Sequence, residues 1–487
     1  MPVTPSRRTL LILAAYVAAA ACWTRFATDV APGWIAAGLE GRAPRPIEAA
    51  ARWFAGERQT AGALDQWRAS GPAVAGALLI HAALLLAIRR WSRGGGRAVT
   101  IASVVLIVAS LAFLIATAVN GDVQDYHLYL DIWREVLAGH DPWYLVAGGP
   151  TATFSLHAYG PLYNLLALPT LWNPLGPKLL FAAAYWAFVS WLALAAPRQG
   201  LPSWWAPALA IWFAGPFAWV EIADFGHFDV LVALSCVAAI ETRAQGRWTA
   251  AALWTASGTL LKYFPAVLAP FSALDRGKVR WRWLAATAGL SVAGLVLAWA
   301  IWGPSVFRPF RLAAGRESAG MSIFRFLSGS HSPIGRDTLV FSPDEMSGPI
   351  LLLGLYMAWR WCRRSGLEPA AAGVTAIVAT LALYKVGFPQ YYMVAYLLVP
   401  YWFARESATL SRRGWVVVAY LAAFAWISLY DFRMARDVPP SILIDEWAGL
   451  VTFPLMTALA VAIAAVGRKE PSPDVSPSSS SPGPRQG

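Results

Sequence analysis

The sequence predicts an all-α, polytopic integral membrane protein with about 11–14 transmembrane or re-entrant helices. Of its 487 residues, 57% are hydrophobic and only 14% are charged, whereas about a quarter of the residues in a soluble domain are charged. Apolar stretches of about 17–25 residues, each long enough to cross a hydrocarbon core of about 30 Å as a helix, recur from Leu10 to Val466. A soluble core could not bury this much apolar surface, so lipid is the expected solvent.

The basic residues orient these spans. The chain has 39 Lys and Arg against 27 Asp and Glu, a net charge of +12, and most of the excess lies in short loops, where Lys and Arg resist translocation. The charge therefore indicates topology rather than a nucleic-acid partner. Both termini are predicted to be cytoplasmic, and the apolar run after Arg7 and Arg8 is predicted to be a retained first span rather than a cleaved signal.

The first half of the chain divides into spans and two interrupted segments. Clean spans are expected at residues 9–27, from about 72 to 88, and at 98–119, 177–196, 204–221 and 229–242. The stretch 159–172 is short and rich in proline, which favours a juxtamembrane or re-entrant helix. Residues 248–273, interrupted by Lys262 and Pro265, are predicted to form a pair of half-helices.

The second half continues with a span at residues 283–302, a long outer loop at 303–349 and five further spans. Beyond Val466 the chain becomes rich in Ser and Pro and cannot bury enough apolar surface to fold. We therefore expect a membrane domain at residues 1–469 and a disordered cytoplasmic tail at residues 470–487. The three cysteines lack CxxC spacing, so neither a disulfide framework nor a zinc site is predicted.

Ionisable side chains collect on one side of this topology. The set expected on the extracytoplasmic face is Asp122, Asp125, Asp131, Glu135, Glu221, Asp224, His227, Asp229, Arg316, Glu317, His331 and Lys385. Because charged groups are costly near lipid unless they are paired or face water, such a collection indicates the functional face. The outer loops, including their short helices, are thus predicted to carry the chemistry.

The segment after the third span is the densest part of this set. If a helix begins near Asp122, then Asp125, Tyr129 and Trp133 follow at i, i+4 and i+8 and share one face. A carboxylate on that face could act as a general base toward an acceptor hydroxyl group. Alternatively, Asp122 caps the helix N-terminus and the other carboxylates are merely solvated.

Cationic residues in two later loops could hold a phosphate group. One loop carries Arg308, Arg311, Arg316 and Arg325, and in the other Lys385 precedes Gln390 and Tyr391. Arg and Lys both suit a phosphodiester or pyrophosphate headgroup, although such residues also contact ordinary lipid headgroups. His227, near Asp224 and Asp229, has either a metal-binding or a hydrogen-bonded structural role, and the sequence leaves this open.

Several runs resemble those of a known superfamily. The run DYHLY from Asp125 to Tyr129, followed by Gly139 and DPWY up to Tyr144, is similar to the D-x-x-x-Y and G-x-(D)-P-Y signature of GT-C superfamily glycosyltransferases. Residues 226–270 resemble a segment of the bacterial polyprenyl-phosphate-mannose-dependent mannosyltransferases. The run KVGFPQY at residues 385–391 is similar to the K-x-x-x-P-Q-Y element of the superfamily. The resemblance extends over roughly residues 110–400.

The resemblance implies a GT-C-like fold and an inverting hexosyltransferase in a bacterial plasma membrane. Such an enzyme moves a sugar, here expected to be mannose, from a polyprenyl-phosphate donor to a lipid or glycan acceptor on the extracytoplasmic face. By resemblance Asp125 would be the catalytic base, with Asp122 as a second candidate. The donor phosphate would bind Lys385, Arg316 and Arg325. The substrate-binding residues implied are Tyr129, His227, Asp229, Gln390, Tyr391 and His331. No cofactor or metal site is predicted, although a divalent cation stays possible.

Two alternatives follow from the same sequence. The superfamily usually places its catalytic Asp directly after the first span, so Asp29 and Asp65 compete with Asp125 for that role. A secondary transporter or a lipid or polysaccharide flippase is the alternative function. It predicts ionisable residues near span midpoints, of which Lys262 is the clearest example.

Overall fold

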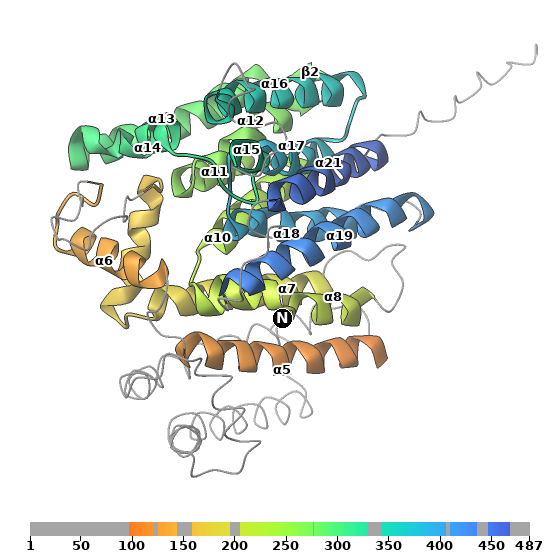
Figure 1. Cartoon of the computed structure of the whole chain (residues 1–487), viewed down its shortest axis with the longest axis horizontal. Coiled ribbons are helices and arrows are strands. Elements are labelled where there is room, and N and C mark those ends of the chain that lie inside the picture. Colours follow the sequence, from red (N-terminus) through yellow and green to blue (C-terminus); the bar gives the residue numbers. More distant parts are fainter. Residues whose placement is uncertain are drawn as a thin grey trace, which may run out of the picture.

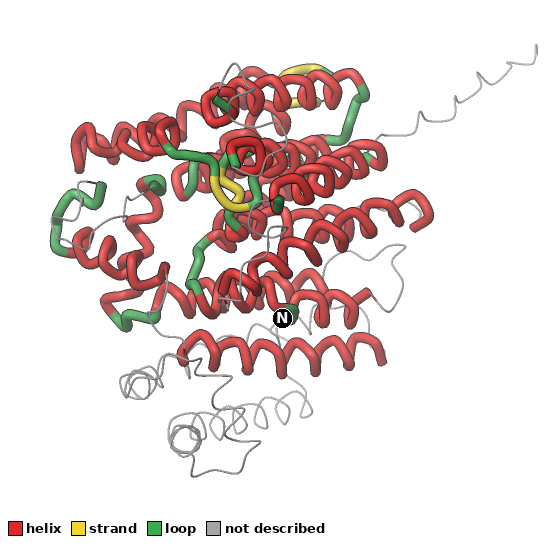
Figure 2. The backbone as a smooth tube through the Cα atoms, viewed as in Figure 1, coloured by secondary structure: helices red, strands yellow, loops and turns green. Residues whose placement is uncertain are grey.

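The computed structural model of the chain describes residues 97–119, 125–143, 158–194, 205–275, 277–329, 342–405, 410–435 and 447–467. These residues are mostly helical, and the long helices lie side by side (Figures 1 and 2). The first two expected spans and the expected tail fall outside the described residues. Apart from two pairs of two-residue strands, the described part of the chain contains only helices and loops, which confirms the predicted all-α class.

Within the described ranges, six helices are long and apolar enough to cross a membrane. Five of the six correspond to α5 (Arg97–Val119), α7 (Gly176–Leu194), α13 (Trp281–Trp302), α19 (Leu410–Ala435) and α21 (Ala448–Val466). The sixth, Trp205–Asp224, joins α8 (Trp205–Phe213), α9 (Pro216–Ala218) and the π-helix η3 (Trp219–Asp224). The chain is therefore a multi-pass membrane protein, as its composition predicts.

The remaining helices complete the bundle. They are α10 (Asp229–Ala244), α11 (Trp248–Leu261), η4 (Phe264–Val267), α12 (Leu268–Ser272), α16 (Pro343–Arg364), α17 (Pro369–Leu383) and α18 (Pro389–Arg405). The predicted half-helices at 248–273 are confirmed, because α11 ends at Leu261 and Lys262 is extended, with φ −154° and ψ 114°. Pro265 then lies in η4, where a missing backbone N–H costs little.

The outer loop at 303–349 is shorter than predicted. It contains η5 (Gly303–Phe307), α14 (Arg308–Gly315) and α15 (Ile323–Ser328), and α16 begins at Pro343 rather than after Pro349. The early start has a local cause. Pro343 occupies the first turn, where its fixed φ suits a helix, and Asp344 and Glu345 favour the positive end of the helix dipole. The apolar pattern alone begins about two turns later.

The centre of the bundle is formed by α10, α17 and α18, most of whose side chains are buried. Helix α17 packs against α10, α16, α18 and α21. Its sequence is rich in small residues, chiefly Ala, which lets neighbouring backbones approach closely where lipid supplies no hydrophobic driving force between helices. This tightly packed centre supports the loops at the bundle ends.

One end of the bundle carries the polar loops. Helix α6 (Asp125–Leu137) and the 3₁₀ helix η2 (Pro161–Leu171) lie there, on the left in Figure 1. Strand β3 (Ala319–Gly320) pairs in parallel with β4 (Val386–Gly387), and this pair is drawn in yellow near the middle of Figure 2. A separate antiparallel pair joins β1 (Leu274–Asp275) and β2 (Lys278–Val279).

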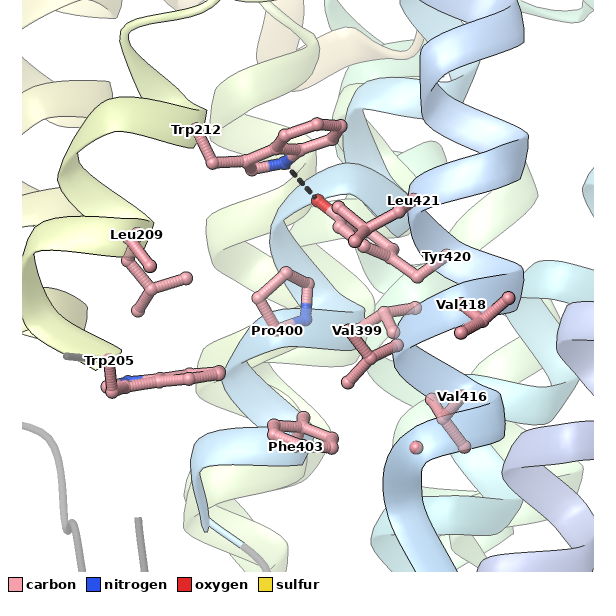
Figure 3. A pocket seen from close by; sticks show the side chains of 13 residues that line it. Trp205, Leu209, Trp212, Val399, Pro400, Phe403, Val416, Val418, Tyr420 and Leu421 are labelled. Atoms are coloured by element: carbon pink, nitrogen blue, oxygen red, sulfur yellow. Dashed lines mark hydrogen bonds between the residues drawn. The ribbon is translucent and has the colours of Figure 1, made fainter. Parts of the chain in front are cut away.

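An apolar groove lies between α8, α18 and α19, with a cavity volume of about 370 Å³. Figure 3 shows its lining, which includes Trp205, Leu209, Trp212, Phe403, Tyr420 and Leu421. Within this lining, Trp212 Nε1 donates a hydrogen bond to the Tyr420 hydroxyl oxygen over 3.0 Å. The groove therefore has the character of a lipid-facing surface.

Candidate active site

Helix α6 presents the predicted face. Asp125 is its first residue, and its side chain is 48% exposed, whereas Tyr129 and Trp133 further along the same face are buried. The rings of Tyr129 and Trp133 pack with centroids 5.9 Å apart. The i, i+4, i+8 arrangement is thus confirmed, and it turns one accessible carboxylate toward solvent above an aromatic core.

His227 links Asp125 to a buried carboxylate. Its Nε2 lies 3.0 Å from Asp125 Oδ2, and its Nδ1 lies 2.5 Å from Glu221 Oε2. The His227 side chain is 5% exposed and that of Glu221 1%. The three side chains therefore form a hydrogen-bonded row from the exposed Asp125 carboxylate to the buried Glu221 carboxylate.

The opposite charges in this hydrogen-bonded row stabilise one another. Burial alone would lower the pKa of His227, but the Glu221 charge and the hydrogen bonds to Asp125 and Glu221 outweigh it and raise that pKa to about 10. Burial would raise the pKa of Asp125, yet the hydrogen bond and positive charge of His227 leave it below its ordinary value. At neutral pH the pair is an imidazolium beside a carboxylate, and both ring nitrogens donate.

Local backbone geometry places His227. We predicted residues 221–229 as an outer loop, and this is wrong for Glu221 and Asp224, which lie in the π-helix η3 and are buried. The chain then turns at Gly226, whose φ of +70° disfavours side chains. A Cβ atom there would lie 2.5 Å from the Tyr126 ring. The sharp turn directs His227 back toward Glu221, whose carbonyl oxygen accepts from the His227 backbone N–H.

An aromatic cluster connects α6 to η2 and α10. The hydroxyl groups of Tyr129 and Tyr159 lie 3.2 Å apart, and the Tyr159 ring packs on Tyr163 and Phe228. Burial raises the pKa of Tyr159 above its ordinary value. Among the nearby charges, Asp125 raises it further and Arg316 lowers it. Tyr159 is thus within electrostatic range of both Asp125 and Arg316.

A buried ion pair adjoins the aromatic cluster. Lys262 Nζ donates to Asp229 Oδ1 over 2.6 Å, and the two side chains are 8% and 1% exposed. The ammonium group also lies 3.9 Å from the centroid of the Tyr391 ring, a cation–π distance. The other carboxylate oxygen of Asp229 is buried with no hydrogen-bond partner in the described part of the chain. Lys262, which interrupts the half-helices, therefore belongs to the polar end.

The β3–β4 pair joins the two cationic loops. The Ala319 backbone N–H donates to the Lys385 carbonyl oxygen, and that of Met321 donates to Gly387. The Arg316 guanidinium group lies 4.9 Å from the centroid of the Phe388 ring. The half-buried Lys385 side chain donates from Nζ to the Ala314 carbonyl oxygen over 3.1 Å. The structure thus brings the Arg316 and Lys385 segments together from distant parts of the sequence.

Comparison with known protein families identifies a matching region that contains most of this site. Residues 157–389 match the model of Glycosyltransferase family 87. This matched region, just under half of the chain, is similar to glycosyltransferase family 87. Family 87 is of the GT-C membrane glycosyltransferase type, so the coarser part of the resemblance is confirmed. No curated protein and no solved structure matches the chain significantly.

The family 87 region contains most of the site but begins after α6. Glu221, His227 and Lys262 lie inside residues 157–389, and Asp125 lies before them. The His227–Asp125 hydrogen bond therefore joins the family 87 region to a segment outside the matched range. The base assignment thus depends on this contact and not on the family match.

The other predicted residues have varied positions. Gln390 follows the first residue of α18, and Arg325 is exposed on α15. Asp122 and His331 lie outside the described residues, as do the rival candidates Asp29 and Asp65. Among the described residues, no group of three or more His, Cys, Asp or Glu side chains is arranged to hold a metal ion.

Sequence reasoning missed three residues of this cluster as site residues: Glu221, Tyr159 and Lys262. Glu221 lies six positions before His227, a spacing that puts the two residues on different faces of an α-helix and about 20 Å apart along a strand. Only the π-helix and the turn at Gly226 bring the two side chains together. Lys262 did carry a signal, because a lone cation between apolar half-helices requires a partner.

Proposed function

We propose that this protein transfers a hexose from a polyprenyl-phosphate donor to a lipid or glycan acceptor at the extracytoplasmic face of a bacterial plasma membrane. The sequence resemblance favours mannose as the sugar. Asp125 would serve as the general base. The proposal depends above all on one observation: an accessible carboxylate on α6 is held by a buried His227, which is itself held by Glu221.

The chemistry assigned to Asp125 follows from this arrangement. The acceptor hydroxyl oxygen attacks the anomeric carbon while its proton passes to the Asp125 carboxylate. The bond between that carbon and the phosphate oxygen breaks, and polyprenyl phosphate leaves with the electron pair, so the configuration inverts. The lowered pKa of Asp125 keeps it ionised at neutral pH. His227 keeps one carboxylate oxygen in place as the proton arrives.

The leaving group explains the need for cations. A donor phosphodiester becomes a phosphomonoester and gains negative charge as the bond to the sugar breaks, so preorganised cations lower the barrier. Arg316 and Lys385 occupy segments joined by the β3–β4 pair. We assign the phosphate to these two residues. Lys262 is already neutralised by Asp229, so it is assigned a supporting rather than a primary role.

The test is a transfer assay on purified protein in nanodiscs. Radiolabelled polyprenyl-phosphate mannose and other polyprenyl-phosphate hexoses are incubated with membrane lipids, using wild type, Asp125→Asn and the matched control Asp131→Asn. Asp131 lies on the same helix, but its carboxylate pairs with the exposed Arg134 over 2.8 Å. We expect transfer to fall about 100- to 10,000-fold in Asp125→Asn and to stay near wild type in Asp131→Asn.

Two results would contradict the proposal in different ways. Undiminished transfer by Asp125→Asn would remove the base assignment while leaving the donor class intact. Wild-type protein that transfers no sugar from any polyprenyl phosphate would contradict the donor class. Movement of the same lipid across vesicles without transfer would then favour the flippase alternative.

A further inference from the structure

A third acidic residue lies beyond Glu221 in the hydrogen-bonded row Asp125–His227–Glu221. Asp431 is on α19, within the apolar span Gly414–Phe432, and its side chain is 1% exposed. Helix α19 packs against η3, which carries Glu221. A carboxyl group at this depth is costly unless it is paired or neutral. Its position therefore calls for a partner.

That partner is Glu221. Helix α19 brings the Asp431 side chain to within interaction range of the Glu221 carboxyl group on η3. An ionised carboxylate only accepts hydrogen bonds, so two carboxyl groups can be bonded directly only if one of them carries a proton. A direct hydrogen bond between Asp431 and Glu221 therefore needs one proton shared by the pair.

The surrounding contacts place this proton on Asp431. Glu221 Oε2 receives a hydrogen bond from His227, which stabilises a negative charge on Glu221. Asp431 Oδ2, by contrast, is buried without a hydrogen-bond partner among the described residues. A charge on Asp431 would leave that oxygen uncompensated, whereas a neutral acid tolerates it far better.

We propose that Asp431 is a neutral acid that donates to Glu221 and acts as a positioning residue for the transfer reaction. It contacts no reacting atom. It fixes the Glu221 carboxylate, which orients His227, and His227 in turn holds Asp125. This inference rests on the function proposed above, with Asp125 as the base. It extends the site from α6 through η3 to α19, near the C-terminal end of the described chain.

The variants Asp431→Asn and Asp431→Val separate this role from simple packing. Asparagine keeps the shape and provides a neutral donor, whereas valine has a similar size and no donor. We expect Asp431→Asn to retain kcat within about threefold. Asp431→Val should lose about 10- to 100-fold in kcat, the worth of a hydrogen bond to a charged group, with the donor KM unchanged. Thermal unfolding and size-exclusion chromatography of each variant report whether it folds.

Isotope-edited infrared spectroscopy of wild-type protein gives a second test that needs no transfer activity. Protein labelled with ¹³C in its aspartate side chains should show a protonated carboxylic acid band at neutral pH, and the band should vanish in Asp431→Asn. Equal losses of kcat in the Asn and Val variants, or the absence of the band, would overturn the proposal. If wild type transfers no sugar but shows the band, only the proposed function fails.

Discussion

The two ends of the same helices differ in both chemistry and geometry. Along the apolar groove, α8 is a regular α-helix, and its side chains face those of α18 and α19. After α8 the helical segment is interrupted at Gly215 and Pro216, and it then continues as the π-helix that carries Glu221. Helix α19 likewise lines the groove near Tyr420 and carries Asp431 near its other end.

This difference shows where the bundle tolerates charge. Regular helices satisfy their own backbone groups and can face lipid, as at the groove. The polar end instead uses a π-helix, an extended residue at Lys262 and a short parallel strand pair. These irregular segments let buried ionisable side chains from distant positions meet, and π-helical turns are often found at functional sites. Function therefore concentrates where helix geometry is interrupted.

The largest stability effect should come from the polar end. Lys262→Met would leave the buried Asp229 carboxylate without its ion-pair partner, and removing one member of a buried pair costs about 3–5 kcal/mol. We expect a clear drop in the thermal unfolding midpoint in detergent. The double variant with Asp229→Asn should recover most of it, because it removes both charges.

Lys385→Met is the matched control, since the Lys385 side chain is half-buried and donates to a backbone carbonyl oxygen rather than to a carboxylate. Its unfolding midpoint should change little. A Lys262→Met protein as stable as wild type would show that the polar end does not depend on this ion pair.

The pH dependence of transfer should also report on the polar end. His227 has a pKa raised to about 10 from an ordinary value of 6.5. In the folded protein its positive charge is therefore present through neutral pH and is lost as the pH rises through about 10. We expect the rate to stay level through neutral pH and to fall about tenfold or more on passing pH 10, as Asp125 loses its donor. His227→Gln should lack this transition, and a wild-type transition near pH 6.5 would contradict the coupling.

The smallest effect is expected at the groove. Trp212→Phe removes the hydrogen bond to Tyr420, but the Tyr420 hydroxyl group keeps its own bond to the Tyr396 carbonyl oxygen. We expect a loss of about 1 kcal/mol in stability and transfer within twofold of wild type. A loss of transfer comparable to that of Asp125→Asn would break the distinction between the two ends and place the groove within the donor site.

The sequence allowed much of the fold to be predicted. Hydropathy located α5, α7 and α13 to within a few residues, because a span must be apolar over a fixed length. The helical spacing of Asp125, Tyr129 and Trp133 identified the face of α6 correctly. These features are local, and local patterns are visible in one sequence.

The rest of the site depends on contacts between distant residues. Asp125 and His227 are 102 positions apart, and the partner of Glu221 lies on α19. Asp431 sits within an apolar span, where the sequence gives no hint of which helix it faces. The π-helical register at Glu221 is set by packing and by the turn at Gly226, and no simple periodicity reveals it.

The most direct test of the account is single-turnover transfer with bound polyprenyl-phosphate mannose, comparing Asp125→Asn with Asp131→Asn. This measurement separates the chemical step from donor binding. We predict unchanged donor affinity in both variants and a chemical step slowed about 100- to 10,000-fold only in Asp125→Asn. A chemical step in Asp125→Asn as fast as in Asp131→Asn would contradict the central claim that the carboxylate held by His227 is the base.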